Sequence, residues 1–354
     1  PDAMIGELQR YLQMREGGVV SVATLFEGAE SEFADLLKLI SETADIDFSQ
    51  YKEPTLKRRI ARRMVLRKCD TVSEYLKIAR ADPSEVSVIY REFLVGVTNF
   101  FRDLPSWRDL EAEYLPRIFA NAKKGETVKV WSVGCSTGEE AYTIAFLIEA
   151  YRRRNEIETE FRVFASDVNA SAIAIAKEGV YPNSTLDEIP NEFREQNFFT
   201  FHGESFHISQ SIRSRVIFSS HNVLENAPYV RTDLIVCRNL MIYLSPEMQK
   251  KVLSVFSFSL RKNGFLFLGA AENIGRNSAG FDAMRGPGRI FQNVRKAPVD
   301  LPNTRSGAHL PLLHAGLTPM PRARRIATRE IQRQNSETTS VLPKLLMQRN
   351  TAGF

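Results

Sequence analysis

Hydrophobic and polar positions change their spacing once along the chain, near residue 103. Before that point, apolar residues recur every three or four positions, as on the buried face of amphipathic helices. These positions are Phe33, Leu36, Leu37, Ile40, Leu56, Ile60, Met64, Val65, Tyr75, Leu76, Ile78, Val86, Ile89, Phe93 and Leu94. Asp82 and Pro83 separate two of the helices, because proline suits a first helical turn and disfavours helix just before it. The pattern predicts a small all-helical domain.

Beyond residue 103, short apolar runs of the β type alternate with helical segments. The expected strands are 128–133, 161–165, 216–219, 234–237 and 265–269, and the expected helices are roughly 139–153, 170–177 and 246–260. Strands interleaved with helices predict an α/β fold with a doubly wound, Rossmann-like parallel sheet. Residues 198–208, with Gly203 near their middle, predict a small β-hairpin insertion.

The two flanks of the chain complete the predicted domain organisation. We expect an N-terminal extension or linker over 1–30, with a short helix at 5–12, a helical domain over 31–103 and a sheet domain over 104–296. Residues 297–354 are rich in Pro, Arg, Ser, Thr and Gln, which predicts a disordered linker or tail with a short terminal helix at 341–347. A first residue other than Met and a helix that restarts near the end lead us to expect a fragment of a longer protein.

Composition narrows these possibilities only a little. The 354 residues carry a net charge of +5, which permits contact with nucleic acid, acidic protein surfaces or anionic lipid and selects none of them. The three cysteines, Cys69, Cys135 and Cys237, argue against a disulfide framework, and no metal-ligand spacing occurs. With no apolar run of membrane-spanning length and no signal peptide, we expect a cytoplasmic protein without a bound metal.

The segment Gly134-Cys135-Ser136-Thr137-Gly138-Glu139-Glu140 joins a buried-type strand to a helix. Such a turn lies at the carboxyl end of its strand, where doubly wound sheets bind ligands. Two carboxylates suit a cationic ligand better than a pyrophosphate. Asp167 ends the next strand and is expected to bind ribose hydroxyls, and Asn222 follows a third strand and is expected to accept the adenine amino group. Cys135 has no base nearby in the sequence and is expected to pack.

Together these segments resemble the CheR-type chemoreceptor glutamate methyltransferases. The resemblance runs from about Phe33 to about Val294, and its most specific pieces are 51–60, 96–103, the turn at 134–140 and 237–243. It implies a class I S-adenosylmethionine-dependent methyltransferase domain preceded by an all-helical domain. The implied activity is methyl transfer from S-adenosylmethionine to receptor glutamate side chains, which leaves methyl esters and S-adenosylhomocysteine.

Functional residues are carried over from the family position by position. The expected cofactor contacts are Thr98, Arg102, Gly134, Glu140, Asp167, Asn222, Val223, Arg238 and Asn239. Arg102 and Tyr243 are assigned to the methyl-transfer centre, although the residues alone favour a surface ion pair for Arg102 and a packing role for Tyr243. Some family members have asparagine where this chain has Gly96, so one polar contact is in doubt.

A basic helix forms the densest positive segment of the chain. Its members include Arg58, Arg59, Arg62 and Arg63. A generic charge run is most often a solvated helix face. Because chemoreceptor methylation helices resemble acidic coiled coils, we expect these four arginines to dock the receptor. RNA binding is the competing interpretation, and the absence of interleaved aromatic residues argues against it.

Three functions stay open on the sequence alone. The first is an active protein-glutamate O-methyltransferase of chemotaxis signalling, acting on receptor cytoplasmic helices without binding nucleic acid or entering the membrane. The second is a weakly active or non-catalytic S-adenosylmethionine-binding module, fused to methylesterase-like and sensor or kinase modules. The third is an RNA or small-molecule methyltransferase, which the absence of an Asn-Pro-Pro-aromatic motif disfavours.

Overall fold

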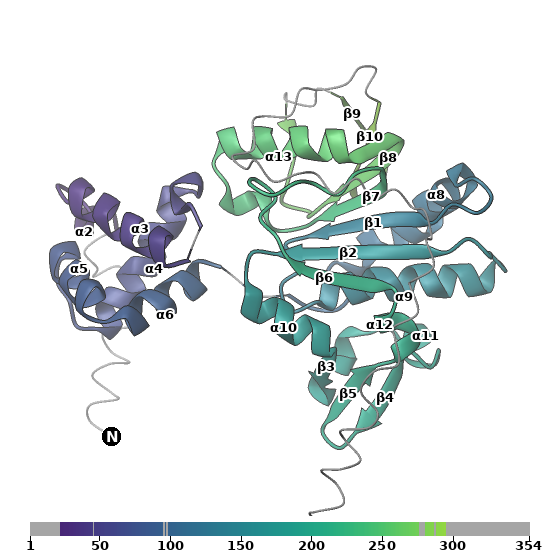
Figure 1. The fold of residues 1–354 in the computed structure, drawn as a ribbon, viewed down its shortest axis with the longest axis horizontal. Helices are drawn as coiled ribbons and strands as arrows, with labels where there is room; N and C mark the ends of the chain where they lie inside the picture. Colours follow the sequence, from purple (N-terminus) through teal and green to yellow (C-terminus); the bar gives the residue numbers. More distant parts are fainter. Residues whose placement is uncertain are drawn as a thin grey trace, which may run out of the picture. The chain divides into compact units, whose positions relative to one another are not determined.

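The structure is a computed structural model, and it describes residues 22–44, 46–94, 96, 98–275, 280–286 and 288–294. These residues all belong to the first of two units of the chain, residues 1–306, and Figure 1 labels their helices and strands. The helices expected at 5–12 and 341–347 lie outside the described residues.

The first part of the described chain is helical. Its elements are α2 (Val22–Leu25), α3 (Glu30–Ala44), η1 (Phe48–Gln50), α4 (Glu53–Leu66), α5 (Val72–Ala81) and α6 (Pro83–Phe93). Side-chain caps start the last two helices: Thr71 accepts a hydrogen bond from the Glu74 N–H, and Asp82 accepts one from the Ser84 N–H. Of the apolar positions expected from the helical spacing, all but Val65 belong to one core or pack against it, and Leu36, Ile60 and Ile89 are fully buried.

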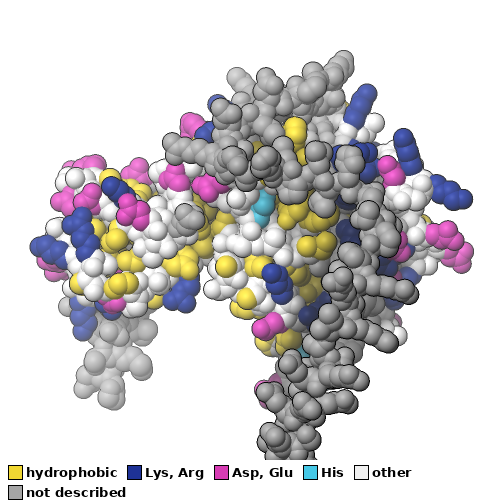
Figure 2. All heavy atoms as spheres, viewed as in Figure 1, with side chains coloured by type: hydrophobic (Ala, Val, Ile, Leu, Met, Phe, Trp, Pro, Cys, Tyr) yellow, Lys and Arg dark blue, Asp and Glu magenta, His cyan; other side chains and the backbone are white. Residues whose placement is uncertain are grey.

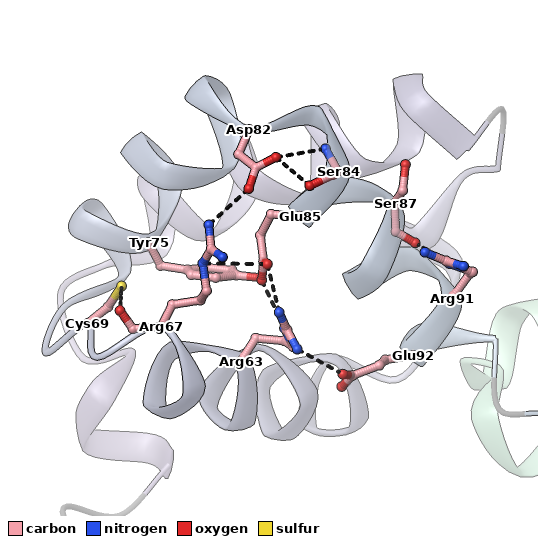
Figure 3. A network of polar contacts seen from close by, with 10 residues as sticks. All are labelled: Arg63, Arg67, Cys69, Tyr75, Asp82, Ser84, Glu85, Ser87, Arg91 and Glu92. Atoms are coloured by element: carbon pink, nitrogen blue, oxygen red, sulfur yellow. Dashed lines mark hydrogen bonds and ion pairs between the residues drawn. The ribbon is translucent and has the colours of Figure 1, made fainter. Parts of the chain in front are cut away.

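A buried ion pair ties α4 to α6 inside this core (Figure 3). Glu85 is only 2% exposed, and it accepts two hydrogen bonds from Arg63, at 2.9 and 2.7 Å, and one from the Tyr75 hydroxyl at 2.7 Å. Burial alone would raise the pKa of Glu85, but the bonds from Arg63 and Tyr75 outweigh it and lower the pKa. The carboxylate is therefore held in its charged form by its partners.

The second part of the described chain contains a seven-stranded sheet in the order β6-β2-β1-β7-β8-β10-β9 (Figure 1). Its strands are β1 (Val128–Val133), β2 (Phe161–Asp167), β6 (Val216–Ser220), β7 (Thr232–Cys237), β8 (Leu260–Leu268), β9 (Phe281–Ala283) and β10 (Arg289–Asn293). The pairs from β6 to β8 are parallel, whereas β10 pairs antiparallel with both β8 and β9. The doubly wound fold class is confirmed, and the expectation of a parallel sheet is wrong at this edge.

Both faces of the sheet are covered, which is why the central strands β1 and β7 are buried along nearly their whole length rather than alternately exposed. Val128 and Val130 of β1 belong to the core on one face, and Trp131 and Val133 belong to the core on the other. The covering helices are α7 (Leu104–Asp109), the π-helical turn η2 (Leu110–Tyr114), α8 (Leu115–Asn121), α9 (Glu139–Arg154), α10 (Ala170–Glu178) and α13 (Pro246–Ser259).

The predicted hairpin is present as part of a small three-stranded sheet in the order β3-β5-β4. Its strands are β3 (Val180–Pro182), β4 (Phe199–His202) and β5 (Ser205–Ile208), with η3 (Asn183–Glu188), α11 (Asn191–Arg194) and α12 (Gln210–Arg213) beside them in the chain. We call residues 180–208 the β-subdomain. The turn between β4 and β5 contains Gly203 with a positive φ of 59°, as the sequence pattern required.

Removing one partner of the buried pair should destabilise the helical part of the chain. In Arg63→Met, Glu85 keeps its charge but loses its main partner, and we expect a loss of about 3 kcal/mol in the free energy of unfolding. Hydrogen exchange of the α4–α6 amides measures this loss. The control is Arg62→Met on the exposed face of the same helix; equal protection in both variants would contradict the prediction.

Candidate functional site

The turn between β1 and α9 is shaped by backbone conformations that favour glycine. Gly134 and Gly138 have positive φ angles of 74° and 101°. A Cβ on Gly138 would lie 2.9 Å from the Cβ of Ala176 and 3.0 Å from the Tyr181 hydroxyl oxygen. A larger residue at 138 would therefore push α10 and the β-subdomain away from the turn.

Asp167, at the end of β2, forms a hydrogen bond with this turn. Its carboxylate oxygens accept hydrogen bonds from the Ser136 N–H at 2.9 Å and the Asn169 N–H at 2.8 Å. Burial raises the pKa of Asp167, and the bonds from Asn169 and Ser136 oppose that rise. Each oxygen keeps a further lone pair, so the carboxylate still has capacity for a ribose diol.

An apolar pocket opens beside Asp167, with about 410 Å³ of space, open solvent included. Asn222 lines it, and its Oδ1 accepts a hydrogen bond from the Leu224 N–H at 3.0 Å, which fixes the amide group. The residues lining this pocket are Tyr51, Val133, Gly134, Asp167, Val168, His221, Asn222, Val223, Leu224, Leu240 and Leu244. A mostly apolar slot with an amide and a carboxylate suits a purine nucleoside.

A polar pocket lies on the other side of Gly134 and has about 500 Å³ of space, open solvent included. It gathers residues from three separate segments of the chain. They are Thr98, Asn99, Arg102, Trp107, Gly134, Ser136, Glu140, Arg238, Asn239 and Tyr243. Because Gly134 borders both pockets, one elongated ligand can occupy them together.

Glu140 is the carboxylate of the polar pocket. Burial raises the pKa of Glu140 to about 7, although Arg238 and a hydrogen bond from the Ser132 hydroxyl, at 2.8 Å, both oppose the rise. A cationic group bound here would favour the ionised form. Glu140 is thus suited to hold an ammonium group of a ligand.

Arg238 is almost entirely buried, and its guanidinium has mainly internal partners. It lies 5.0 Å from the ring centroids of both Trp107 and Phe267. Nη1 donates to the Arg102 carbonyl at 2.8 Å and Nη2 donates to Asp103 at 2.7 Å. Within the described residues Nε has no partner. The main contacts of Arg238 therefore hold residues 102 and 103, and the expected cofactor contact would use its remaining N–H groups.

The segment from Thr98 to Asp103, which we call the linker, has a strained backbone. Phe101 and Asp103 adopt positive φ angles of 49° and 60°, which residues other than glycine rarely adopt. The Phe101 N–H donates to the Thr143 hydroxyl at 3.1 Å, and Trp107 donates to the Arg102 carbonyl at 2.9 Å. These contacts keep the linker against the polar pocket, where Thr98 and Arg102 form part of its lining.

Sequence reasoning missed several residues of the site, among them Glu272 and Tyr51. Glu272 is 3% exposed, and its carboxylate accepts the Asn239 N–H at 2.9 Å, the Gly269 N–H at 2.8 Å and the Ile242 N–H at 3.3 Å. It therefore shapes the turn that leads into η4 (Met241–Tyr243). Nothing in its local sequence signals this role, because two of its three partners, Asn239 and Ile242, lie about thirty residues earlier.

Tyr51 is another missed residue, and it comes from the helical part of the chain. It lines the apolar pocket, and its backbone forms an isolated antiparallel β-bridge with Leu244. The neighbouring Lys52 N–H donates to the Tyr243 carbonyl at 2.8 Å. Burial, with the charge of Asp167 nearby, raises the pKa of Tyr51 to about 12. The sequence drew attention to Tyr51 only as the start of a family motif.

The four expected docking arginines do not share one environment. Arg58 and Arg62 are exposed, whereas Arg59 is half-buried and donates to the Glu92 carbonyl. Arg63 is engaged with Glu85, so it does not lie on an exposed face. Figure 2 shows Lys and Arg mixed with Asp and Glu over the helical elements, rather than a surface of one sign on that face.

Within the described residues no group of histidines, cysteines and carboxylates could hold a metal ion. Burial raises the pKa of the Cys135 thiol well above its ordinary value, so this cysteine packs as a neutral group. In the part of the chain that the structure covers, no helix is long and apolar enough to cross a membrane.

The residues present fit S-adenosylmethionine. The apolar slot suits adenine, Asp167 suits the ribose, Glu140 suits the α-amino group, and the unpartnered Nε of Arg238 is a donor for the carboxylate. When bound, this cofactor supplies an electrophilic methyl group on a sulfonium. Fold and site together define a class I S-adenosylmethionine-dependent methyltransferase.

Family comparison specifies the class further. The chain matches the all-alpha domain of CheR methyltransferases over residues 31–94 and their S-adenosylmethionine-binding domain over residues 96–290. The chain therefore belongs to the CheR methyltransferase family.

Relatives of two sizes resemble the chain. The "Uncharacterized 104.1 kDa protein in hypE 3'region" of Rhodobacter capsulatus is 34% identical over 319 residues, which are 89% of this chain and 32% of that protein. The "Chemotaxis protein methyltransferase" of Listeria monocytogenes is 30% identical and that of Listeria innocua 29% identical, each over 69% of this chain and 91% of the relative. The chain thus spans about a third of the first relative and about nine-tenths of the others.

Cofactor affinity should depend on pH through Glu140. The charged groups around it are Arg238, Arg102 and Glu272, and its pKa of about 7 means that the ionised form predominates only above about pH 7. An ammonium ligand pairs with the ionised form. We therefore expect the affinity for S-adenosylhomocysteine to be full above pH 7.5 and to fall by up to about tenfold per pH unit below pH 7.

Calorimetric titration between pH 6 and 8 measures this dependence. Glu140→Gln should bind weakly and lose the pH dependence. Glu139→Gln is the matched control, since Glu139 is bonded to Thr137 and does not line the polar pocket. A flat profile for the unmodified chain would exclude Glu140 as the ammonium ligand.

Proposed function

We propose that this chain transfers a methyl group from S-adenosylmethionine to the side-chain carboxylate of glutamate residues in chemoreceptors. The products are a glutamate methyl ester and S-adenosylhomocysteine. Support comes from membership of the CheR family and from the relatives named chemotaxis protein methyltransferase. The observation that carries the proposal is the polar pocket, in which Arg102 and Tyr243 border the same space as the cofactor turn.

The proposed reaction needs orientation more than acid–base chemistry. A glutamate carboxylate is ionised near neutral pH and is itself the nucleophile. Its oxygen forms a bond to the methyl carbon while the carbon–sulfur bond breaks, and its negative charge cancels the sulfonium charge without any proton transfer. The site has to align the carboxylate opposite the sulfur and keep water away.

The site residues divide between the two ligands in this proposal. Arg102 orients the acceptor carboxylate, and the Tyr243 hydroxyl fixes that carboxylate or the methyl donor. The residues that bind the cofactor are Thr98, Gly134, Glu140, Asp167, Asn222, Val223, Arg238 and Asn239, all of which line one or both pockets. Arg238 contributes chiefly by holding the linker that carries Arg102.

A second candidate function is a weakly active or non-catalytic cofactor-binding module of a larger signalling protein. It is favoured by the 104.1 kDa relative, of which this chain spans 32%. Gly96, where some family members have asparagine, lines a neighbouring pocket with Ser136 and Tyr243 and offers no side chain there. The two candidates differ in one measurable respect, which is ester formation.

The first test is methyl transfer itself. With labelled S-adenosylmethionine and receptor cytoplasmic fragments, we expect base-labile methyl esters on glutamates. Fragments with glutamine at the acceptor positions should stay unlabelled. Tyr243→Phe should lower kcat by about 10- to 100-fold through loss of alignment, whereas Tyr229→Phe, which removes a hydroxyl bonded to Ser219, should not. Cofactor binding without any ester would favour the non-catalytic module.

Receptor docking is tested on the exposed face of α4. Because receptor methylation helices are acidic, the double variant Arg58→Glu, Arg62→Glu should raise the KM for receptor fragments by about tenfold and leave cofactor affinity unchanged. The matched control reverses two exposed cations on other helices, Lys38→Glu and Lys77→Glu. If both double variants methylate receptors equally well, α4 is not the docking helix.

A further inference from the structure

One carboxylate of the β-subdomain is bonded to the linker of the site. Glu188 ends η3, and its Oε1 accepts a hydrogen bond from the Asn99 side-chain amide at 3.0 Å. Its Oε2 accepts one from the Phe100 N–H, also at 3.0 Å. A single side chain therefore binds two consecutive residues of the linker from a segment almost ninety residues later in the chain.

These two residues lie between two linker positions that line the polar pocket, and Asn99 lines it as well. Thr98 precedes them and Arg102 follows them, and both line the polar pocket with Glu140 and Tyr243. The positive φ angles of Phe101 and Asp103 are costly for these residues, so the linker keeps this conformation only where its surroundings hold it. Arg238 holds the far end, at residues 102 and 103, and Glu188 holds the near end.

The β-subdomain is also tied to the cofactor turn. The Tyr181 hydroxyl donates to the Thr137 carbonyl at 2.7 Å. The Phe100 ring packs against Tyr181, with centroids 5.0 Å apart, and against Phe206, with centroids 6.0 Å apart. One small sheet therefore contacts the linker and the turn, which border the polar pocket from two sides.

We propose that Glu188 is a positioning residue for methyl transfer, which acts by holding the linker so that Arg102 and Thr98 face the polar pocket. It touches neither the cofactor nor the acceptor in this role. The inference rests on the proposed function where kcat for ester formation is measured. Where affinity for S-adenosylhomocysteine is measured, it rests on the cofactor assignment alone.

The test compares Glu188→Ala and Glu188→Gln with Asp187→Asn. Asp187 is the matched control, because it is the neighbouring carboxylate, is 95% exposed and pairs only loosely with Arg194, at 3.7 Å. Glu188→Ala loses both bonds to the linker and should lower kcat for ester formation by about tenfold, and it should weaken S-adenosylhomocysteine binding by about threefold. Glu188→Gln keeps one acceptor and should lie between Glu188→Ala and the unmodified chain.

A double-variant cycle separates positioning from a loss of folding. If Glu188 acts through Arg102, its replacement should cost much less on an Arg102→Lys background than in the unmodified chain. Thermal midpoints of Glu188→Ala and Asp187→Asn should agree within a few degrees. Equal kcat and equal affinity in these two variants would overturn the inference, and so would effects that add in full on the Arg102→Lys background.

The outcomes for Glu188 and for the proposed function can be told apart. If the unmodified chain forms no ester but Glu188→Ala still binds S-adenosylhomocysteine more weakly than Asp187→Asn, the inference stands and the proposed function fails. If the unmodified chain forms esters and Glu188→Ala matches Asp187→Asn in both measurements, the inference fails and the proposed function stands.

Discussion

The buried guanidinium of Arg238 is the interaction on which the geometry of the site depends. It lies 5.0 Å from the ring centroids of both Trp107 and Phe267, and it donates to the Arg102 carbonyl and to Asp103. Two residues of the linker adopt positive φ angles, at a cost on the order of 1–2 kcal/mol each. Without a rigid anchor, the linker would relax away from the polar pocket, and Arg102 would leave the position from which it borders the ligand space.

The charge of Arg238 also acts on Glu140, the carboxylate of the polar pocket. Arg238 is the strongest attraction that opposes the burial-induced rise in the pKa of Glu140. A buried cation that binds the linker on one side and stabilises a carboxylate on the other couples two parts of the site electrostatically. The orientation of the linker and the ionisation of Glu140 therefore both depend on the position of Arg238.

Basic residues on α4 divide between folding and surface roles. Arg63 is committed to Glu85 inside the helical core, whereas Arg58 and Arg62 are exposed on the same helix. The division follows from helical geometry, because residues one or two positions apart lie on different faces. A count of charges along the sequence cannot distinguish these environments, so fewer of these arginines are exposed than their run along the sequence indicated.

Much of the fold was readable from the spacing of apolar residues. The helical spacing before residue 103 and the β-type runs after it correspond to α3–α6 and to β1, β2, β6, β7 and β8. The antiparallel β9 and β10 were missed, because both strands are short and follow the last strong apolar run. The pairing of β10 with β8 depends on a chain reversal that leaves no periodic signal in the sequence.

For the site, the sequence by itself determined the chemistry of the turn at 134–140, the acid at 167 and the family to which these segments point. Local motifs are visible because the residues that form a strand, a turn and a helix start are consecutive. Only the tertiary structure decided which side chains support them. Tyr51, Glu188, Arg238 and Glu272 meet partners from distant segments, and such contacts arise from how strands and helices pack rather than from any spacing along the chain.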